Sequence, residues 1–419
     1  MSLFYRLSAL LLFCSASTFS TQLSAQVFDP TSGCVIDVNG DCIPNTLLTA
    51  VPFLKIAPDA RSGAMGDAGL ATSADANSMH FNASKLAFAE QDFSLSATYT
   101  PWLRELGLTD VYLAYLSGYK KLSEFEAIGV SLKFFSLGDI QFRDINGNPT
   151  GNGRPREFEL AAGYSRKLTD NFSAALSAKY IYSNLASGQR VQGIDITTAN
   201  AFAADISLTY QKELRNDNLF TFGAAISNLG SKVSYTNSAD VKDFLPGNIG
   251  IGGAYKMNFD DFNSLTVTLD INKLLVPTPI PFRIIEEDES GNRTEIPNPD
   301  FDKDEPPNGI GDYREKALFS GVFGSFTDAQ GGLSEELKEL TMSFGLEYWY
   351  NEQFAVRTGY YYENQLKGDR QYLTLGLGLK YNVASINLSY LIPTTNRRSP
   401  LDNTIRFSFI FDSSVFQSR

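Results

Sequence analysis

Residues 53–90, FLKIAPDARSGAMGDAGLATSADANSMHFNASKLAFAE, differ in character from the sequence on either side of them. The stretch is rich in Gly and Ala, and Gly63, Gly66 and Gly69 recur at every third position. Small side chains let a backbone lie close against a surface that surrounds it. These residues are therefore predicted to form a plug, or hatch, inside a wall made by the rest of the chain, with His80 and Asn82 among its polar residues.

The chain after this stretch alternates between apolar and polar residues with a period of two. In YLTLGLGLKY (372–381), four leucines fall on one face, and Thr374, Gly376, Gly378 and Lys380 fall on the other. Such alternation also suits a soluble sandwich. Most segments, however, have roughly the 9 to 11 residues that cross an outer membrane at a tilt. About fourteen strands are predicted, starting near residues 91, 110, 123, 156, 171, 200, 219, 246, 262, 338, 353, 370, 383 and 403.

Short polar turns alternate with longer connections between these segments. This rhythm is typical of an outer-membrane barrel with short periplasmic turns and long extracellular loops. Residues 91–419 are thus predicted to form an all-β, transmembrane antiparallel barrel in contact with outer-membrane lipid, with both termini in the periplasm. Its inward face is expected to carry charges that pair with one another or with the hatch: Lys133, Lys179, Asp205, Asp270, Glu347, Arg357, Lys380 and Arg406.

Composition agrees with one large barrel. The 419 residues include 31 Phe, 20 Tyr and 33 Gly, yet the mean hydropathy is slightly negative, which excludes a bundle of membrane helices. The net charge of −12 argues against nucleic acid, because a phosphate-binding surface needs a concentrated basic stripe.

The N-terminus predicts export. Arg6 precedes an apolar run, and Leu23-Ser24-Ala25 is an acceptable cleavage site, so residues 1–25 are interpreted as a signal peptide. A short membrane anchor is the alternative. Residues 26–52 are expected to be a periplasmic segment in which Cys34 and Cys42 close a disulfide-bonded hairpin around Asn39-Gly40. A calcium loop through Asp37, Asn39 and Asp41 is the competing interpretation, but it lacks the downstream Glu.

The longest connection is residues 273–338. It contains acidic runs and a predicted pair of helices near residues 313–327 and 334–340. Asp300, Asp302 and Asp304 suggest a calcium loop, but Glu305 occupies the position of the expected Gly, so a solvated acidic loop is favoured. Apolar residues then recur at helical spacing and form a stripe, which is expected to pack either on the barrel rim or on another protein. The stripe consists of Leu318, Phe319, Val322, Phe323 and Phe326.

Catalytic chemistry has little support in the sequence. His80 is the one histidine, and neither a Ser, His and Asp arrangement nor a His and Cys cluster can be assembled around it. The run Gly63–Gly69 resembles a phosphate loop only faintly, because its spacing is wrong. We therefore expect no enzyme activity, no cofactor and no metal site.

Three features together resemble the PorV family of the type IX secretion system of Bacteroidetes. These are residues 53–88, the barrel rhythm, and GVFGSFTDAQGGLSEELKEL at 321–340. The likeness covers essentially the whole mature chain. The family is similar to FadL transporters, which implies a fourteen-stranded barrel with an N-terminal hatch. Residues 82–87, NASKLA, resemble the hatch motif Asn-Pro-Ala-x-Leu-Ala but depart from it at Ala83.

The resemblance implies a role in protein secretion. Members bind the C-terminal signal domain of secreted cargo, take it from a large translocon barrel (SprA/Sov-like), and deliver it to a PorU-like signal peptidase complex at the cell surface. An uptake channel for hydrophobic solutes is the alternative function, although it would need a continuous apolar path past the hatch. A lipid A deacylase would need a nucleophile and a base near the membrane plane, whereas His80 lies in the hatch. The residues expected to bind cargo or partner are Phe319, Val322, Phe323 and Phe326, with Asp328, Gly331 and Gly332 shaping the turn between the helices.

Overall fold

The computed structural model describes residues 27–29, 34–36, 42–43, 45–104, 107–143, 147–191, 194–237, 242–279, 283–287, 293–297, 316–329, 332–395 and 402–413. Several predicted features lie outside these residues: the signal peptide, the candidate calcium loops at Asp37–Asp41 and Asp300–Asp304, and Gly331. The side chains of Cys34 and Cys42 are also outside the description, so their disulfide stays a prediction.

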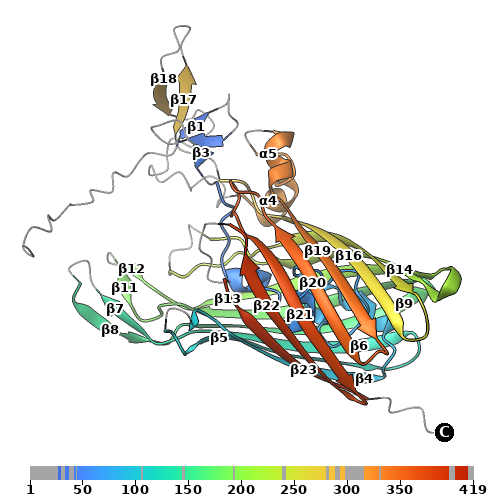
Figure 1. Cartoon of the computed structure of the whole chain (residues 1–419). Coiled ribbons are helices and arrows are strands. Elements are labelled where there is room, and N and C mark those ends of the chain that lie inside the picture. Colours follow the sequence, from blue (N-terminus) through green and yellow to red (C-terminus); the bar gives the residue numbers. More distant parts are fainter. Residues whose placement is uncertain are drawn as a thin grey trace, which may run out of the picture.

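Fourteen antiparallel strands close into one barrel (Figure 1), in which each strand pairs with its neighbours along the chain and β23 pairs with β4. This confirms the predicted fold class, and the strands begin close to the expected positions. The strands are β4 (Phe93–Pro101), β5 (Val111–Lys121), β6 (Glu126–Leu137), β9 (Arg156–Thr169), β10 (Phe172–Asn184), β13 (Ala199–Glu213), β14 (Leu219–Gly230), β15 (Asn248–Asn258), β16 (Asn263–Leu274), β19 (Leu340–Tyr350), β20 (Phe354–Tyr362), β21 (Gln371–Tyr381), β22 (Ala384–Pro393) and β23 (Ile405–Ser413).

The strands have a polar inner face and an apolar outer face. On β21, Leu375 is 46% exposed, whereas its neighbour Thr374 is 0% exposed. Because successive side chains of a strand point to opposite faces, the same alternation runs along the other barrel strands. An apolar exterior around a polar lumen is the arrangement that lets a closed sheet stand in lipid. Among the described helices, none has the length and apolar character needed to cross a membrane.

The connections alternate in length around the barrel. Short turns follow β5, β9, β13, β15, β19 and β21 and share one end, here called the short-turn end. Longer connections share the other end, the long-connection end. They contain the hairpins β7–β8 (Ile140–Arg143, Pro149–Gly153) and β11–β12 (Arg190–Val191, Ile194–Asp195), and the helices α4 (Leu318–Gly324) and α5 (Leu333–Lys338) (Figure 1).

A separate five-stranded sheet joins the N-terminal segment to the longest connection. Its order is β18-β17-β1-β2-β3, with bounds β1 Val27–Asp29, β2 Cys34–Ile36, β3 Cys42–Ile43, β17 Arg283–Glu287 and β18 Arg293–Pro297. Strand β1 pairs with β17 in parallel, with Val27 opposite Arg283. Strands β2 and β3 pair antiparallel, with Ile36 opposite Cys42, which agrees with the predicted hairpin backbone.

The N-terminal segment enters the barrel from the long-connection end. The Asn45 backbone N–H donates to the carbonyl of Leu366 at 2.7 Å, and that of Ala50 donates to Phe244 at 2.9 Å. Both acceptors lie in long connections, after β20 and β14 respectively. Residues 26–52 were predicted to be a periplasmic segment, on the side of the short turns. The described residues 45–52 instead contact the long connections, because local loops and not the strand rhythm decide where this extension lies.

Residues 53–90 then pass through the lumen and reach the short-turn end, where β4 begins. The Asp92 carbonyl accepts a bond from the backbone N–H of Lys121, at the turn after β5. Figure 1 shows this blue segment surrounded by strands. Its short elements are η1 (Pro52–Lys55), α1 (Ala60–Gly63), α2 (Ser78–Phe81) and η2 (Ala83–Phe88).

Candidate functional site

The hatch backbone lies in direct contact with the barrel wall. Gly66 has φ of +66°, and a Cβ added there would lie 2.6 Å from the backbone oxygen of Tyr360. A Cβ on Gly63 would lie 2.0 Å from a side-chain nitrogen of Arg406. Gly63 and Gly66 therefore lie close against the wall, as predicted. Gly69 differs, because the space beside it is filled by Phe81 of the hatch itself.

The wall in turn has glycines where the backbone or the side chains of the hatch lie close. Met65 lies against Gly345 and Gly359, and Met79 lies against Gly129 and Gly163. Leu70 contacts the strands β14 and β15 in the same way, at Gly223, Gly250 and Gly252. The hatch is thus fitted to several sides of the barrel at once.

Buried ion pairs hold the hatch as well. Arg61 donates to both carboxylate oxygens of Glu347, at 2.9 and 2.8 Å, and Arg357 donates to the same carboxylate at 2.6 Å. Farther along, Asp67 pairs with Arg406 at 2.9 Å. Asp67 is partly buried and the other four side chains are buried, so each charge depends on its partner for compensation.

Asp270 holds the hatch through backbone amides. Its Oδ2 accepts from the N–H groups of Gly69 at 2.7 Å and Leu70 at 2.8 Å. Within the wall, Lys179 pairs with Asp205 and Glu159, so the described partners of these inward charges lie both in the wall and in the hatch.

The two polar hatch residues singled out from the sequence have structural contacts. Asn82 Nδ2 donates to Thr209 Oγ1 at 3.0 Å, and Asn82 Oδ1 accepts from the Ser84 backbone N–H at 3.1 Å. His80 lies edge-on to Phe81, with ring centroids 4.7 Å apart. Burial, with the charges of Lys133 and Lys179, lowers the pKa of His80 well below its ordinary value. The histidine is therefore neutral at neutral pH.

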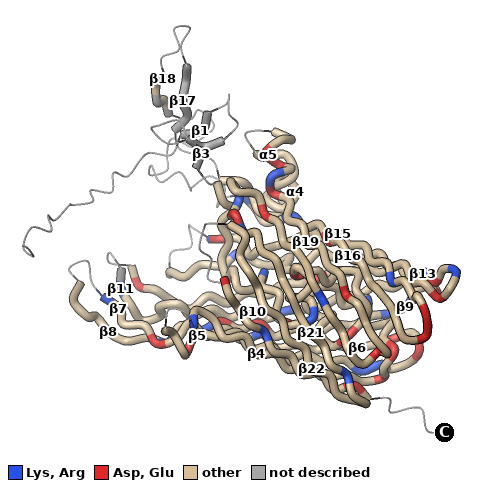
Figure 2. The backbone as a smooth tube through the Cα atoms, in the orientation of Figure 1, with Lys and Arg blue, Asp and Glu red and all other residues tan. Residues whose placement is uncertain are grey.

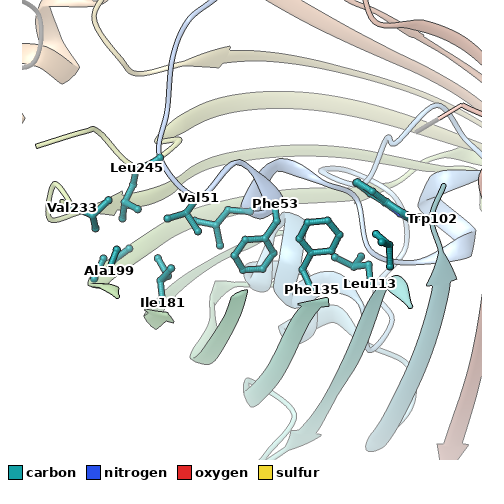
Figure 3. Packing of buried hydrophobic residues seen from close by; sticks show 14 of the residues in the cluster. Val51, Phe53, Trp102, Leu113, Phe135, Ile181, Ala199, Val233 and Leu245 are labelled. Atoms are coloured by element: carbon teal, nitrogen blue, oxygen red, sulfur yellow. The ribbon is translucent and has the colours of Figure 1, made fainter. Parts of the chain in front are cut away.

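An apolar cluster joins the start of the hatch to the wall (Figure 3). The rings of Phe53 and Phe135 are stacked at 6.3 Å, and Trp102 lies edge-on to Phe135 at 5.0 Å. Val51 lies beside this group, so burial of aromatic surface fixes the entry of the hatch into the lumen.

The helices α4 and α5 form a hairpin with an exposed apolar surface at the long-connection end. Phe319 and Phe323 of α4 are 63% and 71% exposed, and Leu333 of α5 is 75% exposed. Val322, also expected to be a contact residue, is only 7% exposed and lies on the buried side of α4. Leu318 and Val322 lie on the face turned to the barrel, where Leu318 packs against the buried side chains of Phe244 and Val276. We call the exposed surface the rim patch: Phe319, Phe323, Phe326, Leu333 and Leu337.

A buried ion network fastens the hairpin to the barrel rim. Lys273 of β16 pairs with Glu336 at 2.8 Å and with Glu339 at 2.5 Å. Lys367, in the connection after β20, pairs with Glu335 at 2.6 Å and with Glu339 at 3.0 Å. Figure 2 marks charged positions in and next to α5 at this rim. This network was not predicted from the sequence, although Glu335, Glu336 and Glu339 share one face of a predicted helix.

The turn between the helices is shaped as expected at two positions. Gly332 caps α5 with φ of +60°, a conformation that suits glycine. Asp328 accepts from the Thr278 N–H at 3.4 Å and pairs with Lys316 at 3.3 Å.

Among the described residues, one cavity lies on each side of the hatch in the lumen. The larger, of about 210 Å³, opens between the hatch and the short-turn end and is lined by residues such as Lys380 and Asp412. The other, of about 150 Å³, lies toward the long-connection end. Within the described residues, no group of three or more His, Cys, Asp or Glu side chains is arranged to hold a metal ion.

Solved structures with a similar fold are hydrocarbon channels and their relatives. The TodX deltaS2S3 mutant monoaromatic hydrocarbon channel is 16% identical, with 85% of this chain and 98% of that chain covered and a TM-score of 0.52. The Ralstonia pickettii toluene transporter TbuX is 14% identical, with 84% and 96% covered and a TM-score of 0.45. A Pseudomonas aeruginosa FadL homologue is 9% identical, with 88% and 99% covered and a TM-score of 0.42.

At such identities the likeness to solved structures concerns the fold alone. A comparison with curated proteins found none that matches this chain. The sequence matches the family model described as "Type IX secretion system protein PorV" over residues 41–281. That match spans more than half of the 419 residues and includes the hatch and the first nine barrel strands. The chain therefore belongs to the PorV family of type IX secretion system proteins.

Proposed function

We propose that this outer-membrane barrel carries secreted proteins between parts of the type IX secretion system. It binds the C-terminal signal domain of cargo at the translocon barrel and delivers that cargo to the surface complex that removes the signal. The long-connection end faces the cell exterior, and the rim patch is the binding surface. The barrel does no chemistry of its own.

The observation that carries this proposal is the rim patch. Apolar aromatic side chains gathered at an exposed surface are typical of protein–protein contact sites, in which a few buried aromatic residues supply most of the binding energy. Phe319, Phe323 and Phe326 lie outside the strands that face lipid, at the end of the barrel where partners would approach.

The anchoring of the hairpin supports the same use. A surface that is already ordered loses little conformational entropy when it binds. The pairs of Lys273 and Lys367 with the glutamates of α5, together with the contact of Leu318 on Phe244 and Val276, hold the patch in one position. A folded signal domain could therefore dock on it as on a rigid interface.

The packing of the hatch argues against the alternative, an uptake channel for hydrophobic solutes. Such a channel needs an apolar path, whereas the inner face of the wall is formed by Ser, Thr and charged residues such as Ser96, Thr209 and Arg406. Moving the hatch would separate the buried pairs of Arg61 and Asp67 from the wall, which is costly.

The test is co-purification of partners with the membrane-extracted protein. The variant changes Phe319, Phe323 and Phe326 to Ser together. We expect the intact chain to retain the translocon barrel or signal-bearing cargo, and the triple variant to lose at least 90% of it, since hot-spot aromatics are each worth roughly 2 kcal/mol or more.

A matched control changes exposed polar residues of the same helices, Ser320→Ala with Ser334→Ala, and should bind like the intact chain. Heat-modifiable migration on gels reports whether each barrel is folded. If the folded triple variant keeps its partners, the rim patch is not the binding surface; if only lipid co-purifies with every version, the secretion role itself is excluded.

A further inference from the structure

The cavity toward the long-connection end lies between the hatch and the strands β14 to β16 and β19 to β21. Its volume of about 150 Å³ leaves room for several waters or one small organic group. Hatch residues such as Leu54, Ile56 and Phe81 supply apolar lining. Its charged lining residues are Lys55, Asp67, Lys179, Asp270, Glu339, Glu363, Lys367 and Arg370.

Seven of these eight charged side chains have a partner. Glu363 pairs with Arg370, and Asp67 pairs with Arg406. Lys179 pairs with Asp205, and Asp270 accepts from the amides of Gly69 and Leu70. Glu339 pairs with Lys273, and Lys367 pairs with Glu335. Lys55 differs, because no described residue accepts a hydrogen bond from its ammonium group. Among the described residues, the cavity therefore contains one cation without a directly bonded carboxylate, and Glu363 acts on it only from a longer distance.

The backbone on both sides of Lys55 is fixed. Lys133 Nζ donates to the carbonyl of Leu54 at 3.1 Å and to that of Ile56 at 2.6 Å. Phe53, two residues earlier, is held in the apolar cluster of Figure 3. Lys55, which lines the cavity, thus projects from a fixed backbone, and a fixed backbone lowers the entropy cost of binding.

The energetics of Lys55 favour an anion in the cavity. Burial lowers the pKa of Lys55 to about 8, with a further contribution from Arg370, while Glu363 acts in the opposite direction. The ammonium form is still the main form at pH 7, yet it is held without the partner that a half-buried charge ordinarily has. An anion beside it would relieve this cost and raise its pKa again.

A second donor and an aromatic wall lie close by. Arg370 uses Nε and Nη2 on Glu363, at 2.7 Å each, and no described residue accepts from its Nη1. Tyr361 and Tyr372 stack at 4.8 Å and also line the cavity. The surroundings thus combine cationic donors with apolar and aromatic surface.

We propose that this cavity binds a carboxylate with a short apolar body, held by the Lys55 ammonium and by Nη1 of Arg370, from which no described residue accepts a hydrogen bond. The carboxylate belongs either to a small free acid or to the carboxyl end of a polypeptide. The proposal concerns the lumen and is independent of the rim patch, so either can fail without the other.

The first test measures chemical labelling of Lys55 in the purified, detergent-solubilised full-length protein. Acetic anhydride modifies amines in their neutral form, and mass spectrometry gives the rate at each lysine. We expect saturating butyrate to slow labelling of Lys55 about tenfold, because a paired ammonium is protected and its pKa rises. Butyramide, which has the same shape and no charge, should leave the rate unchanged.

The second test measures butyrate affinity by calorimetry in matched variants. Lys55→Met should weaken binding about tenfold or more, since a charge-assisted hydrogen bond is lost. Lys55→Arg should retain most of it. Lys380→Met, in the cavity near the short turns, is the control and should bind like the wild type.

A peptide arm distinguishes the source of the carboxylate. A short apolar peptide with a free carboxyl end is compared with its amidated form by the same protection assay. Protection by the free peptide but not by butyrate assigns the cavity to polypeptide ends, and protection by butyrate assigns it to small acids. If neither carboxylate protects Lys55, or if Lys55→Met binds butyrate as tightly as the wild type, the proposal is wrong.

Discussion

At the scale of single residues, Glu347 is the side chain on which the docking of the hatch depends most. It is 3% exposed and accepts hydrogen bonds from Arg61 of the hatch and Arg357 of the wall. Glu347→Ala would leave two buried guanidinium groups without their shared carboxylate. We expect a loss of about 3 to 5 kcal/mol in the free energy of unfolding, measured by urea titration in detergent.

The exposed ion pair of Arg154 and Asp139 provides the control. The two side chains are 83% and 64% exposed, so solvent already screens their attraction. Asp139→Ala should change stability by less than about 1 kcal/mol. Equal losses in the two variants would contradict the view that burial gives the Glu347 pairs their importance.

The sequence predicts the face of each residue better than its partner. Alternation placed Asp270 and Arg357 in the lumen, because a strand has only two faces. It could not show that Asp270 binds the amides of Gly69 and Leu70, since these groups are about 200 residues away in the chain. The burial of Val322 could not be predicted for a related reason. Both sides of α4 are apolar, and only the position of Phe244 and Val276 decides which side is buried.

At the scale of elements, the fit between hatch and wall predicts a sharp difference between two glycines. A Cβ on Gly359 of β20 would lie 2.1 to 2.6 Å from the backbone of Met65 and Gly66, whereas a Cβ on Gly253 of β15 would meet nothing within 4 Å. Gly359→Val should therefore displace the hatch or prevent folding. Gly253→Val should behave as the wild type, because valine suits a strand.

Conductance in planar bilayers and trypsin cleavage of the hatch measure this difference. Wild type and Gly253→Val should be closed and resistant, and any folded Gly359→Val barrel should conduct and be cut within residues 53–90. A folded Gly359→Val barrel that stays closed and resistant would show that the hatch can shift without losing its seal.

The anchoring of α5 gives a second prediction at this scale. Lys367→Met removes a buried partner from Glu335 and Glu339 and leaves their charge poorly compensated. Amide hydrogen exchange of residues 333–339 should become about tenfold faster or more, because local opening costs less. Lys212→Met on an exposed part of β13 is the control, and unchanged exchange in Lys367→Met would show that Lys273 alone holds the helix.

Elements with a regular pattern were predictable, and those that depend on distant pairing were not. Both helices of the longest connection were expected near their observed positions, because their apolar residues recur at helical spacing. The hairpin β17–β18 was missed, since RIIEE and RTEIP read as a charged loop. A signal was present in the intervening Ser290-Gly291-Asn292, residues that favour a turn. The strand that pairs in parallel with β17 is β1, which lies some 250 residues earlier in the chain.

At the scale of the whole molecule, the two ends of the barrel carry different parts of the chain. Residues 45–50 bind long connections, whereas Ser413, the last described residue, pairs with Phe93 at the short-turn end. The alternation of short turns and long connections could not predict at which end residues 45–50 lie. It determines the direction of the strands but not the path of the segment before the hatch. The mature N-terminal segment should therefore be accessible from outside the cell, on the same side as the rim patch.

Labelling of single cysteines with a membrane-impermeant maleimide tests this arrangement. In a background with Cys34 and Cys42 changed to Ser, the exposed positions Leu48→Cys and Ser320→Cys should react in intact cells. Glu124→Cys, in the short turn after β5, should react only after the outer membrane is permeabilised. If Leu48→Cys behaves like Glu124→Cys, the N-terminal segment cannot lie with the long connections. If all three react in intact cells, the barrel has no fixed orientation. Reaction of Leu48→Cys and Ser320→Cys alone would mean that the N-terminal segment and the rim patch lie on the same, outer side of the membrane, so that the hatch must run through the lumen to the periplasmic end.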